Sequence, residues 1–118
     1  MTLAVVDDDV DVRAALSRLL RAMGHQVRLF ASAEEFAGDR HDFDCVILDT
    51  RPPGLNGLEL RERMQAAGRR LPLVFITGDG DYFLGNDVPA DVPTLRKPFD
   101  GDSLVTALRN VGGVHLNQ

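Results

Sequence analysis

The chain has 118 residues, of which 44% are hydrophobic and 26% are charged, proportions that are ordinary for one globular domain. Its formal net charge of -5 argues against broad nucleic-acid binding, because contacts to phosphates need a basic face. The single cysteine excludes an internal disulfide and is typical of a reducing compartment. No apolar run approaches the roughly 20 residues that span a bilayer, and no signal-peptide pattern follows Met1. We therefore expect one cytoplasmic domain over residues 1–118, without a membrane partner or direct nucleic-acid contacts.

The first third of the chain alternates apolar runs with a helical pattern. Leu3–Val6 predicts a buried strand, and Gln26–Phe30 predicts a second strand, in which Val27 and Leu29 alternate with polar residues. Between these strands, apolar residues recur at helical spacing: Val12, Ala15, Leu16, Leu19, Leu20 and Met23. Gly24 follows them and indicates the end of this helix.

The same alternation continues through the middle of the chain. Ser32–Glu35 matches a capping box that begins a short helix. Asp44–Asp49 is apolar without alternation, as expected for a central parallel strand covered on both faces. A third helical face ends at Gly68 and contains Leu60, Met64 and Ala67. Leu71–Thr77 then predicts a fourth strand.

The last third is less regular. Gly78–Asp91 is rich in Gly and Asp and predicts a single turn or an irregular loop where a helix is expected. Val92–Arg96 predicts a fifth strand at a sheet edge, because it contains Pro93. Asp100 or Asp102 is expected to cap a final helix. The whole pattern predicts a three-layer α/β sandwich with a degenerate helix between strands four and five.

Polar side chains follow the predicted strands at the points where the strands end. Asp7 and Asp8 follow the first strand, Asp49 ends the third and Thr77 ends the fourth, while Lys97 follows the fifth. In an open parallel sheet these ends share one edge, where such folds bind ligands. Carboxylates about 4 Å apart repel by about 4 kcal/mol per pair at an effective dielectric near 20, and Mg²⁺ would remove this repulsion. The set therefore predicts a magnesium site at which a carboxylate can accept a phosphoryl group.

Five motifs in this order resemble the receiver domain of two-component response regulators, with the nitrogen-fixation regulator group closest in motif. They are Val-Val-Asp-Asp-Asp at 5–9, Ile-Leu-Asp at 47–49, Arg-Pro-Pro-Gly-Leu-Asn-Gly at 51–57, Phe-Ile-Thr-Gly at 75–78 and Arg-Lys-Pro-Phe at 96–99. The resemblance implies a flavodoxin-like fold whose five-stranded parallel sheet has the order 2-1-3-4-5.

The resemblance also implies a function in phosphorelay signal transduction. A sensor histidine kinase or a histidine phosphotransferase would donate a phosphoryl group, and the domain would switch conformation in response. Homodimerisation on phosphorylation is a further expectation. Such a domain is not a metabolic enzyme, because it catalyses only its own phosphorylation and dephosphorylation.

Roles at the site are implied residue by residue. Asp49 matches the phosphoacceptor and is also a metal ligand. Asp8 matches the direct Mg²⁺ ligand, while Asp7 acts largely through water. Arg51 matches the position whose backbone carbonyl coordinates the metal.

Further matching positions surround the phosphoryl group. Thr77 matches the switch hydroxyl, and Lys97 matches the lysine that pairs with the phosphate. Pro98 follows this lysine, and in the family the Lys–Pro peptide bond is typically cis. Thr94 departs from the family, because an aromatic residue or a histidine usually occupies this position and couples to the switch hydroxyl.

Two charged positions are expected to set the lifetime of the acyl phosphate. Arg51 and Asp79 lie two residues beyond Asp49 and Thr77, and they flank the path along which water attacks in this fold. Substitution of either is expected to change dephosphorylation more than phosphorylation.

Two alternatives come from other functional classes. The first is a small Mg²⁺-dependent phosphatase with an aspartyl-phosphate intermediate, which needs an Asp-x-Asp after the first strand; Asp7-Asp8-Asp9 has this spacing. The second is a flavodoxin-like cofactor binder. The chain lacks a hydroxyl- and glycine-rich loop after the first strand, and its acidic residues there would repel a nucleotide phosphate.

Overall fold

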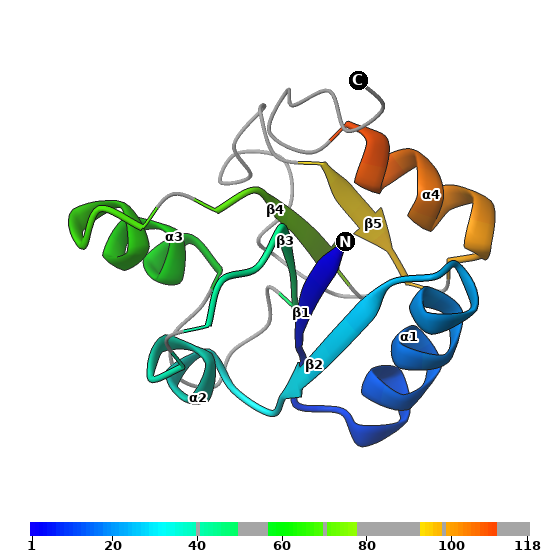
Figure 1. The fold of residues 1–118 in the computed structure, drawn as a ribbon, viewed down its shortest axis with the longest axis horizontal. Coiled ribbons are helices and arrows are strands. Elements are labelled where there is room, and N and C mark those ends of the chain that lie inside the picture. Colours follow the sequence, from blue (N-terminus) through cyan, green and yellow to red (C-terminus); the bar gives the residue numbers. More distant parts are fainter. Residues whose placement is uncertain (40, 50–56, 70, 78–92, 98, 111–118) are drawn as a thin grey trace.

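A five-stranded parallel sheet lies between two layers of helices in the computed structural model (Figure 1). The strands are β1 (Thr2–Val6), β2 (Gln26–Phe30), β3 (Cys45–Asp49), β4 (Leu73–Thr77) and β5 (Thr94–Arg96). The helices are α1 (Val10–Ala22), α2 (Ala33–Ala37), α3 (Gly57–Ala66) and α4 (Gly101–Arg109). The spatial order β2-β1-β3-β4-β5 confirms the predicted flavodoxin-like topology.

The structure describes residues 1–39, 41–49, 57–69, 71–77, 93–97 and 99–110. The segment 78–91, where we expect a degenerate helix, lies outside these ranges. None of the described helices has the length and apolar composition that crossing a bilayer requires.

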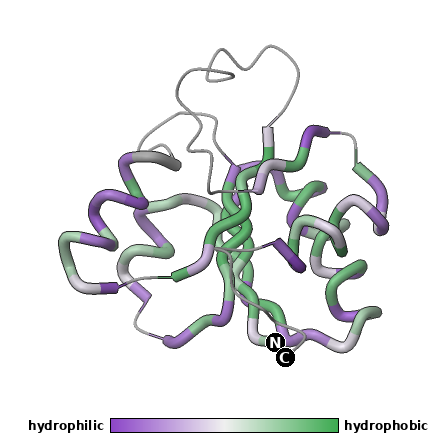
Figure 2. Tube along the Cα trace, turned by 90° about the horizontal axis from the view of Figure 1, so that it is seen from above, coloured by the Kyte–Doolittle hydropathy of each residue, from purple (hydrophilic) through white to green (hydrophobic). Residues whose placement is uncertain are grey.

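The sheet is buried on both faces because side chains of a strand point alternately to opposite sides. In β3, Cys45 and Ile47 belong to the core cluster that also holds apolar side chains of α1 and α4. Val46 and Leu48 belong to the second cluster, with apolar side chains of α2 and α3. Figure 2 shows the hydrophobic strands between the two helical layers. This two-sided burial explains why β3 and β4 are apolar without alternation.

Polar caps begin three of the helices. Asp9 Oδ1 accepts hydrogen bonds from the first backbone N–H groups of α1, at 2.8 and 3.3 Å. Ser32 Oγ accepts from the backbone N–H of Glu35 at 3.0 Å, which confirms the predicted cap of α2. Asp100 Oδ1 accepts from the backbone N–H of Ser103 at 2.8 Å, so Asp100 is the N-cap of α4. These bonds satisfy N–H groups that lack partners within a helix.

Several predicted details differ from the structure, among them the start of β4, which lies at Leu73 rather than at Leu71. Leu29 is 40% exposed, because β2 is an edge strand whose faces are only partly covered. Strand β3 begins at Cys45 rather than at Asp44, whose side chain instead accepts a hydrogen bond from the backbone N–H of Thr2. Ala67 is exposed because α3 ends one residue before it.

Arg69 ties the segment after α2 to the segment after α3. Its guanidinium donates to the backbone carbonyls of Asp39 and His41, at 3.1 and 2.9 Å, and lies 4.8 Å from the centre of the Phe36 ring. We expect Arg69→Met to lower the free energy of unfolding by about 1–3 kcal/mol, because two carbonyls lose a charged donor and the cation–π contact is lost. Urea denaturation measures this change.

Arg18→Met is the control for this substitution. Arg18 is exposed on α1, and the structure shows no such backbone bond for it within the described ranges. An equal loss of stability in both variants would contradict the role assigned to Arg69.

The cap of α4 predicts a dependence of stability on pH. The hydrogen bonds from Ser103 lower the pKa of the Asp100 carboxyl below its ordinary value of 3.8. A carboxyl whose pKa is lower in the folded state stabilises the protein above that ordinary value, and this contribution is lost as the pH falls through the folded-state pKa. We expect Asp100→Ala to lower the thermal midpoint of unfolding at neutral pH. The difference in midpoint between this variant and the wild type should shrink in acid.

Asp102→Ala provides the matched control, because Asp102 also lies in the first turn of α4 but is not its cap. Thermal scans of both variants across acidic pH test the idea. If the thermal midpoint of Asp100→Ala stays below that of the wild type by the same amount below pH 3.8, the effect of the substitution does not come from the charged cap.

Candidate functional site

Three carboxylates meet where β1 and β3 end. Asp7 and Asp8 directly follow β1, and Asp49 is the last residue of β3. One carboxylate oxygen from each residue lies within 4.8 Å of the others. The strand order produces this convergence, because β1 and β3 are neighbours and the direction of winding reverses between them. Ligands of such sheets bind at this switch point.

Asp7 is the most deeply buried member of the group, with 1% of its surface exposed. Its backbone N–H donates to the carbonyl of Phe30 at 3.1 Å, which continues the pairing of β1 with β2. Its Oδ1 accepts from the backbone N–H of Asp9 at 2.8 Å. Burial raises the pKa of the Asp7 carboxyl, the Asp9 hydrogen bond opposes this, and the charge of Asp49 raises it further. A buried carboxylate beside two others favours a cation in the site.

Lys97 supplies the positive charge that the structure places among these carboxylates. Its Nζ lies 3.2 Å from Asp7 Oδ2 and 3.4 Å from Asp49 Oδ2. Its backbone N–H donates to the carbonyl of Thr77 at 2.7 Å, so the pairing of β5 with β4 sets its position. One ammonium group does not neutralise three carboxylates.

Thr77 ends β4 and is 1% exposed. Its Oγ1 is buried and has no hydrogen-bond partner in the part of the chain that the structure describes. Buried hydroxyls are nearly always hydrogen-bonded, so a group left in this state needs an explanation. A hydroxyl at the strand edge beside Lys97 is suited to donate to an anion that binds there.

The residues at this edge fit Mg²⁺. All three candidate ligands are carboxylate oxygens, which are hard donors that magnesium prefers over nitrogen or sulfur. Asp8 is exposed, while Asp7 and Asp49 are buried, so the group is open on one side. Magnesium usually keeps several water or phosphate oxygens among its ligands, which an open site permits.

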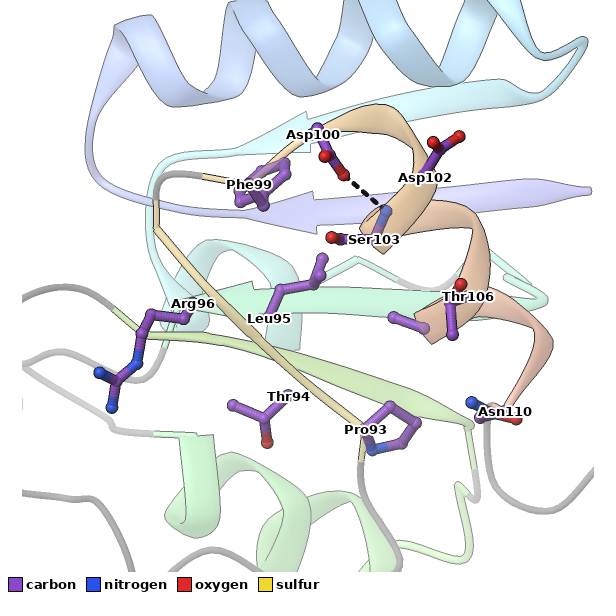
Figure 3. A pocket seen from close by; sticks show the side chains of 11 residues that line it. Pro93, Thr94, Leu95, Arg96, Phe99, Asp100, Asp102, Ser103, Thr106 and Asn110 are labelled. Carbon is purple, nitrogen blue, oxygen red and sulfur yellow. Dashed lines mark hydrogen bonds between the residues drawn. The ribbon is translucent and has the colours of Figure 1, made fainter.

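A separate hollow of about 580 Å³ lies between β5 and α4 (Figure 3). Thr94 is exposed on β5 and lines this hollow, together with Arg96 and residues of α4. No residue of the acidic group lines it. The Asp100 carboxylate at its rim already caps α4 (Figure 3). The hollow therefore offers no carboxylate cluster comparable to that at the strand edge.

Some predicted site residues lie outside the described ranges, and their predictions remain as stated. These are Arg51, Asp79 and Pro98. The structure adds Arg13, which the sequence reasoning missed: its Nη1 donates to the backbone carbonyl of Asp7 at 2.7 Å. A signal existed, because side chains of a helix point back toward its N-terminus and Arg13 lies one turn after the cap Asp9.

Comparison with known proteins defines the class. The family model of the response regulator receiver domain matches residues 3–109. The chain therefore belongs to the response regulator receiver family of two-component signalling, which confirms the resemblance inferred from the motifs.

Individual relatives agree with this assignment. The chain is 35% identical over 115 residues to the response regulator protein TmoT of Ectopseudomonas mendocina, covering 89% of this chain and 50% of that protein. It is 38% identical over 110 residues to the transcriptional regulatory protein FixJ of Bradyrhizobium diazoefficiens, covering 90% of this chain and 54% of that protein. The chain thus spans about half the length of the curated relatives it matches.

Solved structures share the fold over nearly the whole chain. A response regulator receiver protein from Burkholderia phymatum is 34% identical with a TM-score of 0.74, covering 99% of this chain and 98% of that one. The structure of FixJ-N is 26% identical with a TM-score of 0.80, covering 99% and 97% of the two chains.

Proposed function

We propose that Asp49 accepts a phosphoryl group from a histidine kinase or a histidine phosphotransferase in a Mg²⁺-dependent reaction. The observation that carries this proposal is the convergence of three carboxylates within 4.8 Å, with Lys97 bonded to two of them. The buried, unpartnered Thr77 hydroxyl at the same edge supports it within the described part of the chain. Membership in the receiver family supports the choice of donor.

In the proposed reaction, a carboxylate oxygen of Asp49 forms a bond to the phosphorus of a phosphohistidine. The phosphorus–nitrogen bond breaks, and its electron pair stays on the imidazole nitrogen. Asp7, Asp8 and Asp49 would hold Mg²⁺, which would supply positive charge to offset the charge on the phosphoryl oxygens. Lys97 would supply a second positive charge, since its Nζ already lies 3.4 Å from Asp49 Oδ2.

The acyl phosphate would change the demands on the surrounding residues. A phosphoryl group brings a charge of about -1.5 to -2 and oxygens that need hydrogen-bond donors. Thr77 Oγ1 can provide one donor, and Lys97 can exchange Asp7 for a phosphoryl oxygen. Such exchanges order loops in other switches, so phosphorylation would change the conformation at this edge of the sheet.

The experiment is to incubate the chain with acetyl phosphate and Mg²⁺ and to follow the intact mass. We expect the mass of one phosphoryl group to appear, and EDTA to prevent it. A chain that stays unmodified with both acetyl phosphate and a phosphorylated histidine phosphotransferase would overturn the proposal. Size measurements on the same samples show whether modification causes dimerisation.

The phosphatase alternative receives no support from the position of Asp9. The Asp9 carboxylate accepts hydrogen bonds from the backbone of α1 and does not belong to the acidic group. The Asp7-x-Asp9 pair is thus divided between a site residue and a helix cap. We expect no turnover of a chromogenic phosphate ester with Mg²⁺, and the proposal is that the domain modifies only itself.

A further inference from the structure

Arg13 reaches back from α1 to the loop that carries the acidic pair. Its Nη1 donates to the carbonyl oxygen of Asp7 at 2.7 Å, a length typical of a strong, charge-assisted hydrogen bond. Its backbone N–H donates to the carbonyl of Asp9 at 3.0 Å, so its main chain belongs to the first turn of the helix. The Arg13 side chain is half-buried. The residue therefore connects the rigid helix to the end of β1.

The bonded carbonyl belongs to the peptide that joins Asp7 to Asp8. Because a peptide is planar, the direction of this carbonyl sets the backbone rotation after Asp7 and the direction in which the chain enters Asp8. The other polar groups of Asp7 already have partners: its N–H bonds to Phe30, and its carboxylate bonds to Asp9 and Lys97. The hydrogen bond from Arg13 fixes the backbone rotation after Asp7. Asp8, which is exposed, has no comparable bond of its own among those shown by the described residues.

We propose that Arg13 is a positioning residue that orients Asp8 toward Asp7 and Asp49, so that the three carboxylates bind a divalent cation together. This inference rests on the proposed function, because it concerns the same cation site. The positive charge of Arg13 has the opposite effect on cation binding from its hydrogen bond. A guanidinium near three carboxylates repels a cation, so loss of its charge alone would tighten cation binding. Loss of an outer partner that orients a ligand weakens metal binding, typically by 10-fold or more.

The test is to measure the dissociation constant of Mn²⁺ by electron paramagnetic resonance for the wild type, Arg13→Met and Arg13→Lys. Mn²⁺ serves as the probe because it takes oxygen ligands as Mg²⁺ does. We expect Arg13→Met to raise the dissociation constant on the order of 10-fold, as for other outer partners of metal ligands. Arg13→Lys keeps a charged donor on a slightly shorter side chain and is expected to restore most of the affinity. Competition with Mg²⁺ then shows that both ions share the site.

Arg21→Met is the matched control, because Arg21 lies on the same helix and donates to a backbone carbonyl, that of Val27, at 3.1 Å. Thermal unfolding in EDTA measures the structural effect of each variant without metal. We expect Arg21→Met to lower the unfolding midpoint while the Mn²⁺ dissociation constant stays at the wild-type value. If the role of Arg13 were merely structural, Arg13→Met would likewise lower the unfolding midpoint and leave the Mn²⁺ dissociation constant unchanged.

Each outcome decides between the proposals. If the wild type binds Mn²⁺ and Arg13→Met binds it equally well or more tightly, the role of Arg13 is wrong and the proposed function stands. If the wild type shows no saturable binding, both fall. If Arg13→Met does not fold, Arg13→Gln, whose shorter side chain has no charged donor, decides: a raised Mn²⁺ dissociation constant at an unchanged unfolding midpoint supports positioning, and an unchanged dissociation constant overturns it.

Discussion

Asp49→Ala is expected to abolish labelling by acetyl phosphate and Mg²⁺, while the wild type gains one phosphoryl group. Asp49 ends β3 and is 8% exposed, and its carboxylate oxygen lies 3.4 Å from Lys97 Nζ. Alanine removes the nucleophile, and the neighbouring Asp7 is not expected to replace it, because its carboxylate already accepts a hydrogen bond from the backbone N–H of Asp9. Intact mass measurement over a time course gives the extent of labelling.

Asp44→Ala is the control for this experiment. Asp44 lies just before the other end of β3, and its carboxylate accepts a hydrogen bond from the backbone N–H of Thr2 at 2.7 Å. This variant loses the same side chain at a distance from the acidic group and is expected to label as the wild type does. Equal labelling of Asp49→Ala and the wild type would place the phosphoacceptor elsewhere and refute the assignment.

Asp8→Asn is expected to remove the stabilisation of the fold by Mg²⁺. A ligand that binds only the folded state stabilises it by about 2.7 kcal/mol at 100 times its dissociation constant. The wild type should therefore unfold at a higher temperature in excess Mg²⁺ than in EDTA. The exposed Asp8 is the least constrained member of the acidic group, so its replacement by the isosteric amide removes a ligand with little other damage.

The sign of the effect without metal is a second part of this prediction. Two like charges about 4 Å apart in water repel by about 1 kcal/mol, and Asp8→Asn removes such repulsion. In EDTA the variant is expected to be at least as stable as the wild type. Asp11→Asn, which makes the same charge change in the first turn of α1, should keep the full Mg²⁺ effect. If Mg²⁺ raises the unfolding temperature of Asp8→Asn as much as that of the wild type, Asp8 is not a ligand.

The order of the elements and the position of the site were accessible from the sequence because both depend on local patterns. Two-sided burial leaves β3 and β4 without polar residues until their last positions, so Asp49 and Thr77 mark the carboxyl ends of these strands. Asp9 has the residue type and position of an N-cap, and it caps α1. The five motifs add family information that no single pattern contains.

Other features depended on contacts between segments distant in the chain. The choice between Asp100 and Asp102 as the cap of α4 required the backbone geometry, since both are residues that favour caps. The exposure of Leu29 depended on the coverage of an edge strand, which the local alternation of β2 does not contain.

The sequence by itself determined the strands, the helices and the polar residues at the ends of β1, β3, β4 and β5, because burial periodicity and cap chemistry act within a few residues. Only the tertiary structure decided that Lys97 bonds to both Asp7 and Asp49, which lie 90 and 48 residues away in the chain. It likewise decided that Thr77 Oγ1 has no partner among the described residues and that Arg13 holds the loop of the acidic pair. The physical reason is that such contacts depend on side-chain direction and strand register, which the packing of the whole sheet sets.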